Sequence, residues 1–142
     1  MKNRTLGVLI MFLLLFVSCA PKKVEPENKE KLLLTRVKAY WDLRIKGAGP
    51  QERLPFERCG LDPKCKEAFL KGGSGNTITY YSYEILGVEY PDENTALVKI
   101  KVRYKTPPLL GFSFEQTGTF KDKWVYINGQ WYHVIKGFSK EW

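Results

Sequence analysis

The chain has 142 residues, of which 44% are hydrophobic and 14% aromatic, and its formal net charge is +8. This length and composition predict a single domain with a real core rather than an array of domains. The basic residues are dispersed, without a run of five and without a nucleic-acid-binding motif, so nucleic acid is excluded as the expected partner.

The first eighteen residues have the pattern of an export signal. Lys2 and Arg4 precede an apolar run from Leu6 to Val17, which is too short to span a bilayer comfortably. The run ends at Ser18-Cys19, which resembles the lipobox of bacterial lipoproteins, although Phe16 replaces the usual aliphatic residue. We expect residues 1–18 to be a lipoprotein signal peptide and Cys19 to be acylated. An ordinary secretory peptide and an uncleaved anchor are the alternatives.

The same residues predict a location. In the lipoproteins that this segment resembles, an Asp after the cysteine retains the protein in the inner membrane, and this chain has Ala20 there. We therefore expect a cell-envelope protein that is held to the membrane by lipid on Cys19, with the outer membrane favoured over the inner. Loss of residues 1–18 lowers the formal net charge to +6, because it removes Lys2 and Arg4 and no acidic residue. A moderately basic domain suits an anionic lipid surface.

Residues 19–29 are rich in proline and charge, and they predict a flexible tether to a domain that spans 30–142. Asn28 is a candidate N-cap. From Lys29 to Lys46 the apolar residues recur at spacings of three and four, which predicts an amphipathic helix of about four turns.

Residues 51–61 are expected to be irregular, and a short helix is expected after them. Asp62-Pro63 supplies an N-cap and a proline suited to the first helical position, so the helix should cover Lys64–Lys71 and stop at Gly72-Gly73.

From Thr77 onward the hydrophobic period changes from that of a helix to that of strands. Strands are expected over Thr77–Tyr90, Thr95–Thr106 and Phe112–Ile127, and in a closing hairpin. The second strand alternates cleanly between apolar residues and lysine or arginine, so it should have one buried and one basic face. Gly87 is expected to mark a bulge or bend in the first strand.

The hairpin has the strongest local signal in the chain. Asn128-Gly129 tolerates the positive φ angles of a type I′ turn and lies between two aromatic, β-branched runs. A two-residue loop places Tyr126 opposite Trp131 and Trp124 opposite His133. Both faces of this hairpin are apolar, so we expect both to be covered.

Cys59 and Cys65 remain once Cys19 is assigned to lipid. An even pair in an exported protein favours a disulfide, worth roughly 2 kcal/mol for so short a loop. Free thiols, or a redox or metal role, are the alternatives. A zinc site would need four ligands, and the only histidine, His133, lies far away in sequence, so no metal or cofactor is expected.

The order of elements predicts an α+β fold, in which a long N-terminal helix and a short helix pack on a curved four-stranded antiparallel meander. Long strands must twist and coil, so the sheet should form a cone with an open mouth, which is a natural place for a ligand.

Three segments carry a resemblance to a known superfamily. They are Arg36–Leu43 (R-V-K-A-Y-W-D-L), the strand Thr95–Tyr104, and the final D-K-W-V…N-G-Q-W-Y-H-V between Asp122 and Val134. On these residues the chain, over roughly 30–138, resembles the nuclear-transport-factor-2-like (cystatin-like) superfamily. The resemblance implies a cone-shaped fold, frequent homodimerisation through the outer sheet face, and either isomerase, dehydratase or hydrolase chemistry in the cone or binding without chemistry.

An enzyme of this kind needs a carboxylate or histidine base inside the cone. The candidates are Asp42, Glu115, Asp122 and His133, with Glu84 as a further carboxylate. Aromatic residues either line a ligand cavity or fill it; the candidates for lining are Tyr40, Trp41, Tyr83, Tyr104, Phe112, Phe114, Trp124 and Trp131.

Two classes of function remain open. The first is a lipid-anchored, non-catalytic envelope domain that binds a protein partner or a small apolar ligand, or associates with itself. The alternative is an isomerase- or dehydratase-like enzyme that acts on an apolar substrate in the cone.

Overall fold

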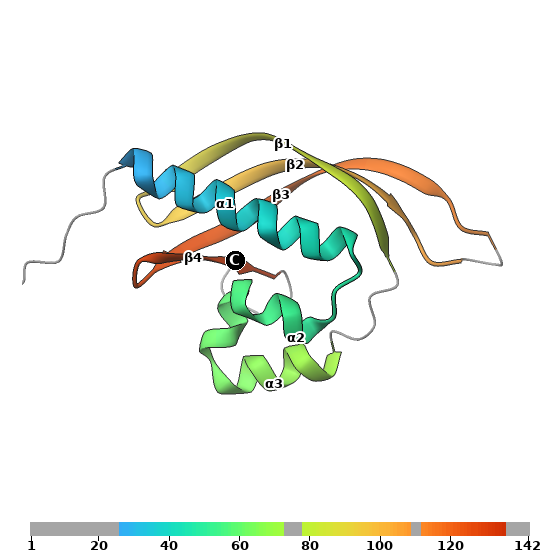
Figure 1. Ribbon diagram of the computed structural model, residues 1–142, viewed down its shortest axis with the longest axis horizontal. Helices are drawn as coiled ribbons and strands as arrows, with labels where there is room; N and C mark the ends of the chain where they lie inside the picture. The colour runs from blue at the N-terminus through green and yellow to red at the C-terminus, as the bar shows by residue number, and fades with distance from the viewer. Residues whose placement is uncertain (1–25, 73–77, 109–111, 136–142) are drawn as a thin grey trace, which may run out of the picture.

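The computed structural model describes residues 26–72, 78–108 and 112–135. The helical elements are α1 (Pro26–Ile45), α2 (Pro50–Arg53), the 3-10 turns η1 (Leu54–Phe56) and η2 (Arg58–Leu61), and α3 (Pro63–Gly72). The strands are β1 (Thr79–Asp92), β2 (Thr95–Lys105), β3 (Glu115–Ile127) and β4 (Gln130–Val134). The long helix α1 lies along one face of the curved sheet, and the short helices gather at one side (Figure 1).

The strands form one antiparallel sheet in the order β1-β2-β3-β4, so the predicted meander is confirmed. With α1 and the short helices on one face, the α+β architecture predicted from the sequence is also confirmed. The signal peptide (1–18), the lipidation site Cys19 and the C-terminal residues 136–142 lie outside the described residues.

Helix α1 begins earlier than predicted. It starts at Pro26, which suits the first turn because proline has no N–H to leave unsatisfied. Asn28 is therefore inside the helix, and the prediction that it caps the helix was wrong. The expected tether (19–29) overlaps α1 at residues 26–29, and residues 19–25 lie outside the described residues. The indole of Trp131 donates to the carbonyl of Lys29 at 2.9 Å, which holds this end of α1 to the hairpin.

The segment 51–61 is not irregular, contrary to the prediction. Pro50 opens α2, and the chain continues through η1 and η2 to α3. These turns are too short for a hydrophobic period to develop, which is why the pattern did not reveal them. The predicted cap of α3 is confirmed, since the Asp62 carboxylate accepts from the backbone N–H of Cys65 at 2.8 Å.

Cys59 and Cys65 form a disulfide, with their Cα atoms 5.1 Å apart. The bond joins η2 to the first turn of α3. The predicted pairing is therefore present, and the alternatives of free thiols or a metal role for this pair are not. We call the short helical elements α2, η1, η2 and α3, of which the last two are joined by this bond, the helical lobe.

Strand β2 contributes the sheet side of the hydrophobic core. Its predicted alternation is confirmed by four fully buried side chains that face α1: Ala96, Val98, Ile100 and Val102. From the helix, Leu33, Val37, Tyr40 and Trp41 meet them. Gly87 lies at a register shift of β1, so the expected bulge is also confirmed.

The hairpin has the predicted turn and register. Asn128 and Gly129 both have positive φ, at 50° and 86°, and Trp124 pairs with His133. Strand β3 begins at Glu115 rather than at Phe112, because only a single bridge forms at Phe112 before regular pairing starts. β4 spans only Gln130–Val134 and pairs with the last part of β3.

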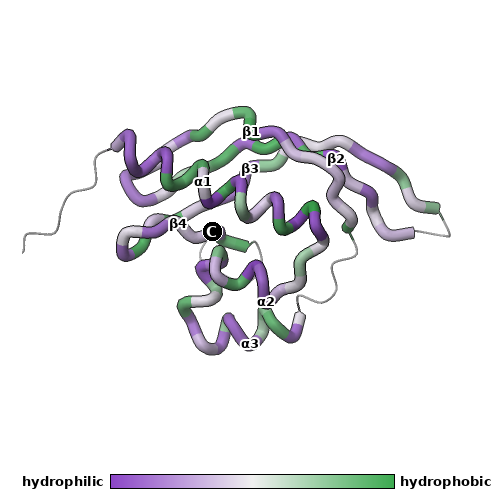
Figure 2. The backbone as a smooth tube through the Cα atoms, in the orientation of Figure 1, coloured by the Kyte–Doolittle hydropathy of each residue, from purple (hydrophilic) through white to green (hydrophobic). Residues whose placement is uncertain are grey.

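The sheet extends beyond the helix that covers it. In Figure 1, β2 and β3 run past the carboxyl end of α1. Phe120 pairs with Ile100 and so points to the core side of the sheet, yet it is 43% exposed. Hydrophobic residues also mark the far end of the β2–β3 hairpin (Figure 2), where Phe112 and Phe114 are exposed.

Candidate functional site

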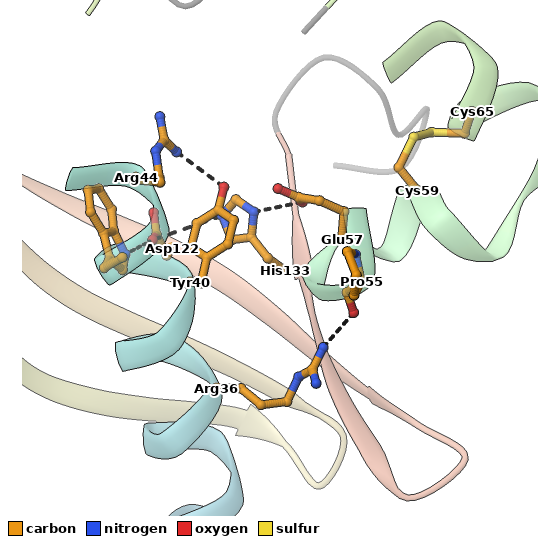
Figure 3. Close-up of polar contacts among 10 residues, drawn as sticks. Arg36, Tyr40, Arg44, Pro55, Glu57, Cys59, Cys65, Asp122 and His133 are labelled. Carbon is orange, nitrogen blue, oxygen red and sulfur yellow. Dashed lines mark hydrogen bonds and ion pairs between the residues drawn. A yellow bond between two sulfur atoms is a disulfide. The ribbon is translucent and has the colours of Figure 1, made fainter. Parts of the chain in front are cut away.

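A polar cluster is enclosed between α1, the sheet and the helical lobe (Figure 3). Helix α1 contributes Tyr40 and Arg44, which lie one turn apart and therefore on the same side of the helix. Asp122 comes from β3 and His133 from β4. Glu57, between η1 and η2, forms an isolated parallel bridge with His133 and so reaches the cluster from the helical lobe.

His133 lies between two carboxylates. Its Nδ1 is 2.9 Å from Oε2 of Glu57, which is hydrogen-bond distance, and its Nε2 is 3.9 Å from Oδ2 of Asp122. The same Asp122 oxygen accepts a hydrogen bond from the indole N–H of Trp41 at 2.9 Å. Glu57 thus orients the imidazole, and Trp41 holds Asp122 in place beside it.

Aromatic rings close this arrangement from solvent. The ring of Tyr40 lies 4.5 Å from that of His133, and the ring of Trp124 lies 5.4 Å away. The His133 side chain is 7% exposed and the Glu57 side chain is fully buried. A substrate would have to displace packed aromatic side chains to reach Nε2, so this geometry suits a structural polar network better than an open catalytic site.

Burial also determines the protonation state of Tyr40. The pKa of Tyr40 is raised far above its usual range, first by burial and then by the negative charge of Glu57. The phenol therefore stays neutral and serves as a hydrogen-bonding group, accepting from Arg44 Nη1 at 3.2 Å. It is not an acid that ionises at neutral pH.

The four sequence-derived candidates divide into two pairs. Asp122 and His133 are brought together in the cluster. Asp42 lies on the exposed side of α1 and accepts from the Tyr83 hydroxyl at 3.0 Å, while Glu115 is exposed at the start of β3. Glu84 is also exposed on β1. The enclosed part of the cone therefore contains neither Asp42, Glu115 nor Glu84.

The aromatic candidates divide in a similar way. Tyr40, Trp41, Trp124 and Trp131 are buried in the core, and Tyr83 and Tyr104 are partly buried against it. Phe112 and Phe114 are 68% and 61% exposed, so they lie outside the enclosed core. They precede the regular part of β3, where the sheet has passed the end of α1.

Sequence reasoning missed Glu57 and Arg44. Glu57 lies in a segment without a period, and nothing in the sequence indicated that it would meet His133, 76 positions later. Arg44 had one usable signal, its position four residues after Tyr40 on an amphipathic helix.

Within the described ranges, no three or more histidine, cysteine or acidic residues are grouped as metal ligands would be. No helix among the described residues is both long enough and apolar enough to cross a membrane.

The sequence matches no protein-family model and no curated protein. Solved structures with a similar fold include Aln2 from a Streptomyces species, at 14% identity and a TM-score of 0.49, over 78% of this chain and 88% of that one. An NTF2-like protein of unknown function from Prochlorococcus marinus is 16% identical with a TM-score of 0.47, over 74% and 87% of the two chains.

A third similar structure is a variant of Rv3472, a protein of unknown function from Mycobacterium tuberculosis, at 13% identity and a TM-score of 0.46, over 77% of this chain and 72% of that one. At such identities and TM-scores, nothing about activity follows from these likenesses. The long helix on a curved antiparallel meander, which the order of elements predicted, is present in the structure itself.

Proposed function

We propose that this chain is a lipid-anchored domain of the cell envelope that binds a small apolar ligand without transforming it. The binding surface lies on the core side of the sheet, next to the carboxyl end of α1. We call it the open-end surface and define it by Tyr80, Tyr104, Gly118 and Phe120.

One observation carries the proposal: Phe120 faces the core side of the sheet and remains 43% exposed. Its ring lies 5.8 Å from that of Tyr104, which in turn lies 6.4 Å from Tyr80. Gly118 lets these rings lie close to the backbone of β3, because a Cβ there would lie 3.0 Å from the Phe120 ring and 3.4 Å from the Tyr104 ring. A contiguous aromatic surface continuous with a core is a typical place for an apolar ligand.

The proposed absence of chemistry is supported by the enclosure of His133. The histidine and both carboxylates beside it are engaged with protein groups, and rings of Tyr40 and Trp124 stand against the imidazole. The accessible aromatic surface and the polar groups suited to catalysis thus belong to different parts of the cone.

The ligand proposal can be tested with decanol as the apolar probe and a mature chain that starts at residue 19 and carries Cys19→Ser. Titration calorimetry should detect saturable binding that Phe120→Ser weakens about tenfold, since a buried Phe contributes roughly 1.5–3 kcal/mol. Phe112→Ser is the matched control, because Phe112 is exposed outside the open-end surface, and it should leave the affinity unchanged. Equal affinities in all three proteins, or an absence of binding, would overturn the proposal.

The anchor has its own test. Mass spectrometry of the protein from the native membrane should find acyl chains on Cys19 and no residue before it. Because Ala20 stands where an inner-membrane retention signal would have Asp, Ala20→Asp should shift the protein toward the inner membrane in fractionated cells. An N-terminus at residue 1, or Cys19 without lipid, would contradict the anchor.

Homodimerisation through the outer sheet face stays a prediction. That face exposes Lys99, Lys101 and Arg103 on β2. Two such faces repel each other, so a dimer formed there should strengthen as salt screens the repulsion. Sedimentation at low and high ionic strength tests this dependence, and a monomer at all salt concentrations would contradict the prediction.

An isomerase- or dehydratase-like enzyme is the second candidate, favoured by the approach of Asp122 to His133 Nε2. In a dehydration, that nitrogen would remove the proton α to a carbonyl, the Cα–Cβ double bond would form as the Cβ–O bond breaks, and the resulting imidazolium would return the proton to the leaving hydroxide, which departs as water. The ultraviolet absorbance of the enone formed from an apolar β-hydroxy ketone would report turnover. Turnover that is lost in His133→Gln and retained in Asp42→Asn would establish this candidate and overturn the non-catalytic proposal.

A further inference from the structure

Arg44 is held inside an aromatic cage near the carboxyl end of α1. Its guanidinium carbon lies 4.4 Å from the ring centre of Tyr80, 5.1 Å from that of Trp41 and 5.6 Å from that of Tyr40. Nη2 donates to the Tyr80 hydroxyl at 2.6 Å and Nη1 donates to the Tyr40 hydroxyl at 3.2 Å (Figure 3 shows the second bond). Three rings and two hydroxyls thus fix the position of the cation.

Among the described residues, this cation has no acidic partner in contact with it. Within the part of the chain that the structure describes, no carboxylate lies within 4.0 Å of the Arg44 guanidinium. Its Nε is buried and makes no hydrogen bond there. A guanidinium has five N–H donors, and only two contacts to neutral hydroxyls are made. Phenol oxygens and ring faces offset the cost of burying a cation less fully than a carboxylate does.

The caged cation adjoins the open-end surface. Tyr80 is a member of both, because it accepts from Arg44 and its ring continues to Tyr104 and then to Phe120. A fixed positive charge is therefore continuous with an exposed apolar surface. A ligand that covered both would need one anionic end and an apolar body.

We propose that Arg44 binds the carboxylate of an amphiphilic monoacid whose apolar tail lies on the open-end surface. This inference rests on the function proposed above and specifies its ligand class. A planar carboxylate matches the fork of a guanidinium and can accept from two N–H groups at once. A monoanion fits better than a phosphate or a diacid, because Arg44 is a single cation and the negative charge of Asp122 also acts on it.

The test compares decanoate with decanol, which have equally long chains but differ in charge, in the mature chain with Cys19→Ser below the concentration at which decanoate forms micelles. Titration calorimetry at neutral pH should give decanoate an affinity about tenfold higher than that of decanol, as expected for a charge-assisted bidentate contact. Arg44→Gln should remove this preference and leave decanol binding in place, which also shows that the variant is folded. Arg44→Lys keeps the charge but not the fork, and it should retain only part of the preference.

Arg36→Gln is the matched control. Arg36 is on the same helix and also stacks on a ring, 4.7 Å from the centre of Phe56, but it belongs to neither the cage nor the open-end surface. It should leave the preference for decanoate unchanged. Equal affinity of decanoate and decanol in the unmodified chain, or a preference that survives in Arg44→Gln, would overturn the inference while the binding of apolar ligands stood. Failure of both probes to bind would overturn the proposed function as well.

Discussion

The imidazole of His133 lies 2.9 Å, through its Nδ1, from Oε2 of Glu57, and this contact joins the last strand to the helical lobe. Both side chains are almost completely buried. The lobe is otherwise cross-linked within itself by the Cys59–Cys65 disulfide, which does not reach the sheet. The Glu57–His133 contact therefore provides a specific polar connection between the lobe and the sheet.

Loss of the Glu57 carboxylate should destabilise the domain strongly. Glu57→Ala removes one partner of a buried pair and leaves the Nδ1 of His133 without its acceptor, so we expect the free energy of unfolding to fall by about 3 kcal/mol. Urea unfolding followed by tryptophan fluorescence measures this change.

The matched control is Glu67→Ala. Glu67 pairs with Lys71 at the surface, where both side chains are mostly exposed, so this change should cost less than about 1 kcal/mol. Equal effects of the two substitutions would show that the buried contact contributes no more than a surface pair.

Reduction of the disulfide should have a moderate effect. The cross-link closes a short loop, and its loss should lower the free energy of unfolding by about 2 kcal/mol through the entropy of the unfolded chain. Thermal unfolding with and without a phosphine reductant should show a lower midpoint in the reduced protein. The double variant Cys59→Ala, Cys65→Ala should not respond to the reductant; an unchanged midpoint in the unmodified chain would contradict the prediction.

Alanine substitutions at two glycines can distinguish the cost of a strained backbone conformation from the cost of a steric clash. Gly129 has a φ of +86° with nothing within 4 Å of a Cβ added there, so Gly129→Ala should destabilise by about 1–2 kcal/mol through backbone strain alone. Gly87 also has open space but its φ lies outside the positive range, so Gly87→Ala should be neutral or slightly stabilising. Urea unfolding of both variants measures this difference. Similar changes in the free energy of unfolding for the two variants would contradict the prediction.

Alkaline pH should weaken the fold through Tyr83. Burial, together with the hydrogen bond to Asp42, raises the pKa of Tyr83 to about 12. Because this pKa is raised on folding from an ordinary value of about 10, the folded state holds the proton more tightly. The resulting stabilisation is complete below about pH 10 and is lost as the pH rises through about 12.

The absorbance of tyrosinate during an alkaline titration measures that pKa when the curve of Tyr83→Phe is subtracted from that of the unmodified chain. Asp42→Asn should move the Tyr83 pKa part of the way back, because the effect of burial remains. A Tyr83 that titrates at its ordinary pKa in the unmodified chain would rule out the Asp42 contact.

The elements predicted well are those whose signal is local. The turn at Asn128-Gly129 requires positive φ, and a two-residue loop then determines which residues pair across the hairpin. In β2, alternation over eleven residues was enough to identify the buried face. The cap at Asp62 was likewise readable from two adjacent residues.

The site was less predictable, because it depends on contacts between distant segments. Asp122 and His133 were both candidates, yet only tertiary structure could show that they meet and that Tyr40 closes over them. Glu57 reaches the cluster because short turns bring the chain alongside β4, and such turns have no hydrophobic period. The open-end surface depends on where α1 ends relative to β3, which element lengths alone do not determine.

The location of the ligand is tested most directly by a map of the backbone amide NMR shifts of the mature chain as decanol is added. We expect the largest changes at Tyr104, Gly118 and Phe120, with little change at Glu57 and His133. The largest changes at Glu57 and His133 instead would show that the enclosed cluster opens to ligands, and would contradict a binding surface separate from it.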